Sequence, residues 1–260
     1  MDTRFWGRDG WKLLHSIAYS YNDVINEVMN DVINDKDIYK HYKTFFKSIQ
    51  HVLPCIYCRR SYKKYITEHP FPKELTQKEL TKWLYTIHNC VNDKLRKQEY
   101  NIESDPSLKE VDEYYKNYVK KINCMIGFDF IYCILFNYNH TTISECRKKG
   151  YLQFFDSLQY ILPNDKVRKV YQEFLKRYSI EDCIYSKSKS RSRSKSPSQH
   201  ELGCPKLKKW GYKLEKTMKE KCCSYKERCE KIEKYRVNKC VGETCRIKKA
   251  SPQKMRKKSL

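Results

Sequence analysis

The sequence predicts an all-α fold. Only 7 glycines and 8 prolines occur among 260 residues, so few positions interrupt a helix. Apolar residues recur at intervals of three and four through much of the first 180 residues, which is the spacing of one helix face. Helices of this kind bury their apolar stripes against one another, and we therefore expect helices packed around an aromatic core.

The amphipathic pattern predicts four helices in the N-terminal part of the chain, at residues 9–30, 37–52, 55–69 and 79–97. Pro70 and Pro72 end the third helix, because proline cannot continue it. Thr76 and Glu79 have the spacing of a capping box at the start of the fourth. A short fifth helix is expected from Leu108.

Two further regions follow the predicted bundle. Residues 123–180 repeat the helical pattern in three short pieces, which predicts a small helical domain. Residues 186–198 consist of Ser, Lys, Arg and one Pro; they cannot bury a core and predict a disordered linker. We therefore divide the chain into a helical bundle, a small helical domain and a disordered basic tail, with these bounds: 1–117, 118–185 and 186–260.

Positive charge is concentrated in this tail. Residues 186–260 contain 25 Lys and Arg against 7 Asp and Glu, a net charge of +18 out of +23 for the whole chain, which leaves +5 for residues 1–185. The tail is therefore expected to contact polyanions through counterion release. It has no pattern typical of a large core, and we expect it to be dispensable for reaction with small dithiols but to matter for protein substrates or for location.

The most informative local motif is Cys55-x-x-Cys58. Two thiols at this spacing can close a disulfide or share a metal ion. Pro54 stands where it would pre-set the first turn of a helix. The positive end of that helix, with Arg59 and Arg60, favours the thiolate form of cysteine. Redox chemistry is therefore favoured; the alternative, half of a zinc site, has no second ligand pair of suitable spacing.

Aromatic and histidine side chains share helix faces on both sides of this motif. Trp11 and His15 are four residues apart, as are His88 and Asn92. Such a set suits a planar, anionic cofactor, because aromatic faces stack on rings, amides and imidazoles bind ring edges, and cations bind phosphates. For Trp11 and His15, a core aromatic stripe with a satisfied histidine is the alternative interpretation.

Three motifs occur in a fixed order: Gly7-Arg8-x-x-Trp11-x-x-x-His15, Pro54-Cys55-x-x-Cys58 and His88-Asn89-x-Val91-Asn92-x-x-Leu95-x-Lys97. In order and spacing they resemble the FAD-linked sulfhydryl oxidases of the Erv/ALR type, particularly those of large DNA viruses. The resemblance covers residues 1–117, which is less than half of the chain.

The resemblance implies that residues 1–117 form a helical bundle that binds FAD, and we expect this segment to bind FAD on its own. It also implies that Cys58 lies against the isoalloxazine ring and that Cys55 faces incoming thiols. The FAD contacts that it implies are Arg8, Trp11, His15, Tyr21, His88, Asn92, Lys97, Tyr100 and Tyr115. Tyr115 stands where the family commonly has Trp.

The function that the resemblance implies is an FAD-dependent thiol oxidase. It would form disulfide bonds in thiol-containing protein substrates, reduce molecular oxygen to hydrogen peroxide, and form a homodimer. The N-terminus lacks the pattern of a signal peptide, and the most apolar run is too short to span a bilayer. We therefore expect a soluble protein, located in the host cytoplasm or the virion if the chain is viral.

Six cysteines lie among the lysines of the tail: Cys204, Cys222, Cys223, Cys229, Cys240 and Cys245. Three interpretations stay open, namely a dithiol shuttle toward Cys55, a zinc knot formed by Cys222, Cys229, Cys240 and Cys245, and incidental thiols. We assign no metal ligands. For the whole chain, the alternative to an enzyme is a basic nucleic-acid-binding or packaging protein with a helical scaffold.

Overall fold

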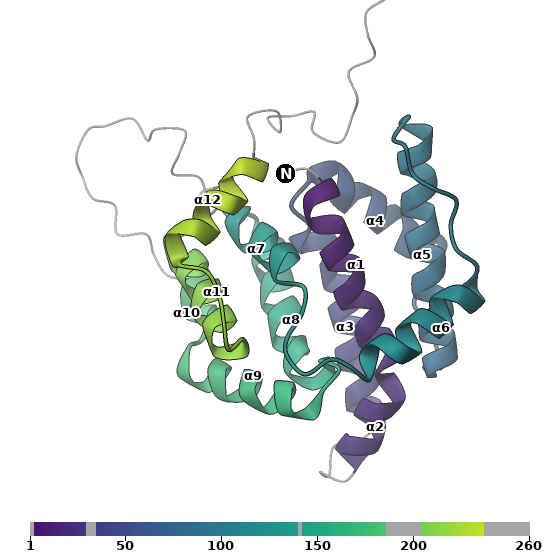
Figure 1. Cartoon of the computed structure of the whole chain (residues 1–260), viewed down its shortest axis with the longest axis horizontal. Coiled ribbons are helices and arrows are strands. Elements are labelled where there is room, and N and C mark those ends of the chain that lie inside the picture. The colour runs from purple at the N-terminus through teal and green to yellow at the C-terminus, as the bar shows by residue number, and fades with distance from the viewer. Residues whose placement is uncertain (1–2, 30–34, 140–141, 186–203, 237–260) are drawn as a thin grey trace, which may run out of the picture.

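The computed structural model describes residues 3–29, 35–139, 142–185 and 204–236. Within these ranges the chain forms twelve α-helices and no strand, which confirms the all-α class (Figure 1). The helices are, in chain order, α1 (Thr3–Tyr19), α2 (Tyr21–Met29), α3 (Asp35–Val52), α4 (Ile56–Glu68), α5 (Gln77–Lys97), α6 (Leu108–Val119), α7 (Phe128–Phe136), α8 (Glu145–Ile161), α9 (Asp165–Arg177), α10 (Ile180–Tyr185), α11 (Pro205–Met218) and α12 (Tyr225–Arg236).

The first predicted helix consists of two helices, α1 and α2, separated at Ser20. The hydroxyl of Ser20 donates a hydrogen bond to the carbonyl of Ile17, a local bond that competes with regular helix. The next three helices lie within two residues of their predicted bounds. At the start of α5, the Thr76 hydroxyl accepts a hydrogen bond from the Glu79 N–H at 3.2 Å.

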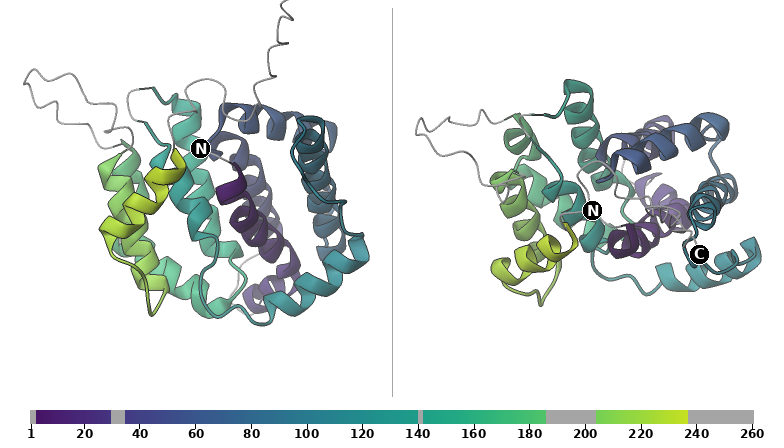
Figure 2. Two further views of the ribbon diagram at one scale, coloured as in Figure 1. Left: turned by 45° about the horizontal axis from the view of Figure 1, so that its top comes forward. Right: turned by 90° about the horizontal axis from the view of Figure 1, so that it is seen from above.

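One apolar core connects the early and late helices. The most extensive helix pair joins α3 to α8, and α1 packs on α7. The helices from α7 onward lie beside the purple and blue helices of the N-terminal bundle (Figure 2). At the crossing of α3 and α8, a Cβ added to Gly150 would lie 2.4 Å from the Cβ of His51. The segment predicted as a second domain therefore shares its core with the bundle.

Residues 204–236 correct the prediction of a tail without a core. Helix α11 buries Leu207, Trp210 and Leu214, and packs on α7 and α9. Helix α12 packs on α7, and its Ile232 is fully buried. The apolar stripe of α11, which continues to Met218, lies among lysines, and for this reason the overall composition gave no indication of it. The predicted linker at 186–198 lies outside the described residues, as do Cys240 and Cys245.

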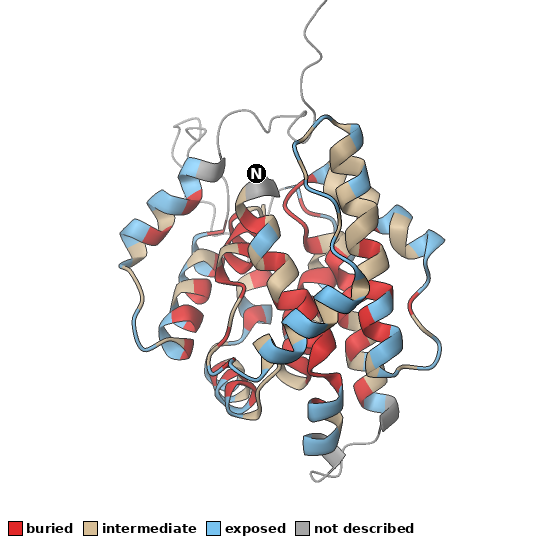
Figure 3. Cartoon of the chain, turned by 45° about the vertical axis from the view of Figure 1, so that its right-hand side comes forward, coloured by how far each residue is buried: buried red, intermediate tan, exposed pale blue. Residues whose placement is uncertain are grey.

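Burial differs strongly between individual helices (Figure 3). Every residue of α7 except Asp129 is buried, whereas α6 has no buried residue and lies against α1. A helix that is apolar on all sides belongs inside a core, and α7 occupies that place here. Among the described residues, no helix combines the length and the apolar character needed to cross a membrane.

Candidate functional site

A cavity of about 440 Å³ lies between α1, α4, α5 and α7. Its volume is within the range of roughly 300–1,000 Å³ that is typical of small-molecule and cofactor sites. Aromatic and aliphatic side chains form most of its wall. The predicted site residues that line it are Arg8, Trp11, Cys58, His88, Asn92 and Tyr100.

A stack of rings extends from the cavity wall into the protein. Trp11 stacks on His88 with ring centres 3.9 Å apart and planes 14° apart. His15 lies behind this pair, with its Nε2 3.0 Å from Nδ1 of His88. Tyr115 of α6 stacks on His15 at 4.7 Å. His15 and Tyr115 therefore do not line the cavity; they form a second layer that supports His88.

The two histidines of this stack are neutral at pH 7. Burial lowers the pKa of His15 to about 3, and the neighbouring His88 contributes further. Burial also lowers the pKa of His88, to about 4. In their mutual hydrogen bond one ring nitrogen therefore donates and the other accepts. The remaining nitrogen of His15, Nδ1, is buried without a hydrogen-bond partner among the described residues.

Asn92 is held at the cavity by a carboxylate outside it. Its Nδ2 donates a hydrogen bond to Asp105 at 2.7 Å. Arg96 donates to both oxygens of the same carboxylate, at 3.3 and 2.6 Å. The hydrogen bonds from Arg96, and then from Asn92, lower the pKa of Asp105. With one N–H of Nδ2 donated to Asp105, Asn92 can offer its amide oxygen and its second N–H to a ligand.

The two cysteines of the C-x-x-C motif differ in position. Cys55 is the N-cap residue of α4, with extended backbone angles, and is 3% exposed. Cys58 lies in the first turn of α4, is half-buried and lines the cavity. Next to it, Arg59 donates a hydrogen bond to the carbonyl of Leu53 at 2.7 Å. Its guanidinium is thereby fixed against the loop that leads into the motif.

The burial of Cys55 differs from the expectation that this thiol faces incoming substrates. Helix α8 packs along α3, whose last residues lead into the motif. Arg147 of α8 donates a hydrogen bond to the carbonyl of His51 at 2.9 Å, only four residues before Cys55. Because the resemblance covers residues 1–117, it contained no information about α8, which packs next to the segment that leads into the motif.

Two of the predicted FAD contacts lie away from the cavity. Tyr21 donates a hydrogen bond to the carbonyl of Leu75 at 3.0 Å and lines a separate cavity of about 530 Å³ between α2, α3 and the loop before α5. Lys97 is exposed and does not line the 440 Å³ cavity.

Several residues line the cavity that the sequence did not indicate, among them Trp6, Lys94 and Phe130. The sequence could have indicated Lys94, because it lies three residues after Val91 of the third motif and therefore on the same face of α5. Trp6 lies within the first turn of α1, before the part of the helix that was predicted. Phe130 belongs to α7, and no local pattern relates it to the motifs of the N-terminal bundle.

Among the residues that the structure describes, no group of three or more His, Cys, Asp or Glu side chains is placed to hold a metal ion. The suggested zinc knot includes Cys240 and Cys245, so it extends beyond the described ranges.

Comparison with known proteins gives a match over the N-terminal segment that contains most of these site residues. The model of the Erv1 / Alr family matches residues 8–116, which confirms the resemblance over that segment. Over 101 residues the chain is 35% identical to the mitochondrial FAD-linked sulfhydryl oxidase of Saccharomyces cerevisiae, which covers 38% of this chain and 48% of the yeast protein. Over 94 residues it is 35% identical to a probable FAD-linked sulfhydryl oxidase of Acanthamoeba polyphaga mimivirus, covering 35% and 59% of the two chains.

The chain thus spans about half the length of the curated relatives it matches. No solved structure matches it. The helices from α7 onward lie outside the segment that the family model matches.

Proposed function

We propose that the protein is an FAD-dependent thiol oxidase that forms disulfide bonds in protein substrates. The observation that supports this most strongly is the position of Cys58: one thiol of a C-x-x-C motif lines the same cavity as Trp11, His88 and Asn92. The two relatives at 35% identity have FAD-linked sulfhydryl oxidase in their names, and the family match includes both cysteines.

The residues of the cavity fit FAD. The Trp11–His88 stack supplies a flat surface for the isoalloxazine ring, and the Asn92 amide supplies a polar group for its edge. Arg8 and Lys94 line the cavity as cations for the phosphates. Trp6 lines the cavity, and its buried Nε1 has no protein partner among the described residues, as expected where a ligand completes the hydrogen bonding.

The chain's own chemistry is thiol–disulfide exchange. A substrate thiolate attacks one sulfur of the Cys55–Cys58 disulfide, forming a mixed disulfide and releasing the other cysteine as a thiolate. A second substrate thiol then displaces the enzyme, so that the substrate leaves oxidised and the C-x-x-C pair is reduced. When bound, FAD would accept the resulting two electrons and pass them to molecular oxygen, giving hydrogen peroxide.

Access to the pair favours a polypeptide substrate. Ile56, between the two cysteines, is 45% exposed, so an apolar side chain lies at the surface beside the reactive motif. An unfolded chain presents apolar segments that can pack on such a residue. Because Cys55 is 3% exposed, attack on this sulfur requires the loop before α4 to open. Cys58 lines the cavity that we assign to FAD, so a substrate thiol would not reach it from that side while the cofactor is bound.

We extend the proposal to partners and location. The protein would act as a homodimer, whose interface must avoid the faces of α1 and α3 that α7 and α8 cover. The basic segment 186–260 would contact a polyanion, with binding that weakens as salt is added. As the mimivirus relative suggests, the setting would be a virus-infected cell, in the host cytoplasm or the virion.

The experiment is an absorbance spectrum of the purified chain, together with oxygen consumption on dithiothreitol. We expect a flavin spectrum and thiol-dependent oxygen uptake. A protein that folds but shows no flavin band when FAD is supplied would contradict the proposal and favour the alternative of a nucleic-acid-binding protein.

A matched pair of variants tests the role of the dithiol. Cys58→Ser is expected to abolish turnover and to leave FAD bound. Cys90→Ser on α5 is the control: Cys90 does not line the cavity, and burial raises the pKa of its thiol, which disfavours the reactive form. Equal activity in the two variants would exclude Cys58 from the reaction.

A further inference from the structure

One wall of the cavity comes from outside the segment that matches the family. Phe130 belongs to α7, is 1% exposed and lines the cavity. It stacks on Trp6 with ring centres 5.5 Å apart and planes 27° apart. Both residues lie outside the matched range 8–116. The two rings therefore form an aromatic surface of the cavity that lies outside the matched segment.

The Trp6 ring presents an unused donor in this wall. It is 8% exposed and lines the cavity, and its Nε1 has no hydrogen-bond partner among the described residues. A buried indole N–H usually finds an acceptor, and leaving it unpaired costs free energy. A ligand with carbonyl or phosphate oxygens would supply the acceptor that the protein does not.

Helix α1 packs closely against the ring of Phe130. A Cβ added to Gly10 of α1 would lie 3.1 Å from Cγ of the Phe130 ring. Asp9, the residue before this glycine, accepts hydrogen bonds from the N–H groups of Asp129 at 2.8 Å and Phe130 at 3.4 Å. The first turn of α7 is thus joined directly to the part of α1 that contains Arg8 and Trp11.

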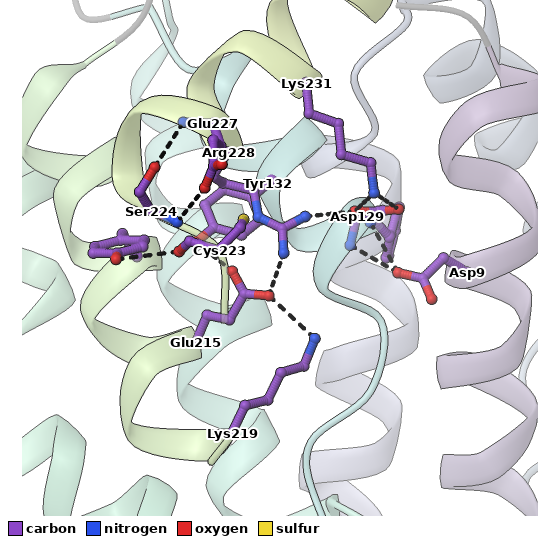
Figure 4. A network of polar contacts seen from close by, with 12 residues as sticks. Asp9, Asp129, Tyr132, Glu215, Lys219, Cys223, Ser224, Glu227, Arg228 and Lys231 are labelled. Atoms are coloured by element: carbon purple, nitrogen blue, oxygen red, sulfur yellow. Dashed lines mark hydrogen bonds and ion pairs between the residues drawn. The ribbon is translucent and has the colours of Figure 1, made fainter. Parts of the chain in front are cut away.

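The last two helices fix the same turn from the other side (Figure 4). The Asp129 carboxylate accepts from Arg228 and from Lys231 of α12, each at 3.0 Å. Arg228 also pairs with Glu215 of α11, a carboxylate that is fully buried. The position of Phe130 is therefore determined by an ion-pair network between α7, α11 and α12.

From these contacts we propose that Phe130 and Trp6 bind FAD directly and that α7, held by α11 and α12, completes the cofactor site. This inference rests on the proposed function. The ring of Phe130 would pack on the bound cofactor, and the Trp6 N–H would donate to it. The segment 1–117 lacks Phe130 and every helix that holds it, so it would not form this site, in contrast to the expectation that it binds FAD on its own.

The test measures FAD affinity of the full-length apoprotein by quenching of flavin fluorescence. Phe130→Ala is expected to weaken binding at least tenfold, and Trp6→Phe, which keeps a ring and removes the N–H, about fivefold. The control is Phe136→Ala, because Phe136 is equally buried in α7 but does not line the cavity. It should lower the apoprotein Tm as Phe130→Ala does, with FAD affinity within about twofold of the parent chain.

Equal affinities in Phe130→Ala and Phe136→Ala would overturn the inference. If Phe130→Ala does not fold, Phe130→Leu keeps an apolar side chain without the ring, and unchanged affinity there would overturn it equally. If the parent chain binds no FAD, the proposed function is rejected. If the parent chain binds FAD and the Phe130 and Trp6 variants bind it with the same affinity, only this inference is rejected.

Discussion

The two sides of the interface between α1 and α7 differ in whether their buried polar atoms have hydrogen-bond partners. On α1, three atoms are buried without hydrogen-bond partners among the described residues: Nε1 of Trp6, which lines the cavity, and Nδ1 of His15 and the hydroxyl of Ser16, which do not line it. On the far side, the buried Glu215 accepts from Arg228, from Lys219 at 3.1 Å and from the Tyr132 hydroxyl at 2.9 Å. Only Nε of Arg228 lacks a described partner there.

This contrast separates a binding region from a supporting region. Native proteins leave few buried polar atoms unpaired, and those that remain call for an explanation such as a bound ligand. A cofactor in the cavity would explain the unpaired Nε1 of Trp6, whereas the network around Glu215 is already nearly complete. Four predictions test this division, and the largest effect is expected where a whole supporting element is removed.

Ending the chain after Tyr185 should abolish folding. This truncation removes Leu207, Trp210 and Leu214 from the core, and burial of each such side chain contributes about 1.5–3 kcal/mol. The sum is comparable with a total stability of roughly 5–15 kcal/mol. Ending the chain after Arg236 should leave Tm and FAD content unchanged. Thermal melting followed by circular dichroism checks both; equal stability of the two truncations would restore the simple tail that the sequence predicted.

Arg228→Met should destabilise the protein by about 3–5 kcal/mol, because it leaves the carboxylate of Glu215 buried without its main partner. Lys231→Met is the matched control in the same helix. Lys231 is 45% exposed at its side chain, and its pairing with Asp129 should be worth at most about 1 kcal/mol. Urea unfolding of both variants measures the difference. Similar losses would show that the network is a set of weak surface pairs.

Acid should destabilise the apoprotein through the histidine pair. The folded-state pKa values of His15 and His88 are lowered to about 3 and about 4, so their stabilising effect is complete above about pH 6.5 and is lost as the pH falls toward those values. Each histidine contributes a slope of up to about 1.4 kcal/mol per pH unit in that window. His15→Phe should give a shallower dependence, and a slope equal to that of the parent chain would contradict the assignment.

The smallest effect concerns two lysines of α5. Lys94→Ala should weaken FAD binding by up to about fivefold, because Lys94 lines the cavity and a partly exposed cation contributes at most about 1 kcal/mol. Lys97→Ala should have no effect, since that side chain is exposed and outside the cavity. Titration at low and high salt checks both, because screening should reduce the Lys94 effect. If Lys97→Ala weakens FAD binding more than Lys94→Ala does, Lys97 is the residue that contacts the phosphates.

The sequence indicated the N-terminal helices well because each has strong local signals. The Thr76 cap and the Pro70 break bound α4 and α5, and their apolar stripes have the period of a helix. The break at Ser20 was missed, because a serine inside an apolar pattern is an unremarkable helix residue. Helix α11 was missed because its apolar stripe lies among lysines.

For the site, spacing identified the residues of a single helix face but not the depth at which each would lie. Trp11 and His15 share a face, yet only Trp11 lines the cavity, because Tyr115 and His88 enclose His15. Spacing along one helix could not predict that Phe130 lines the cavity. Its place in the cavity depends on how α7 packs against α1, and such tertiary contacts leave no periodic trace in the chain.

Gly150 has a consequence for how the protein tolerates change. Within a helix, glycine costs about 1 kcal/mol relative to alanine, so an isolated α8 would gain from replacement. In the folded chain any side chain at this position meets His51 and forces α8 away from α3. In a library of all substitutions at Gly150 that is screened for folded protein, we expect only glycine to be recovered. A screen of the reacting cysteines for turnover would give the same strict result. A position without a side chain would then look like part of an active centre, although it takes no part in the chemistry.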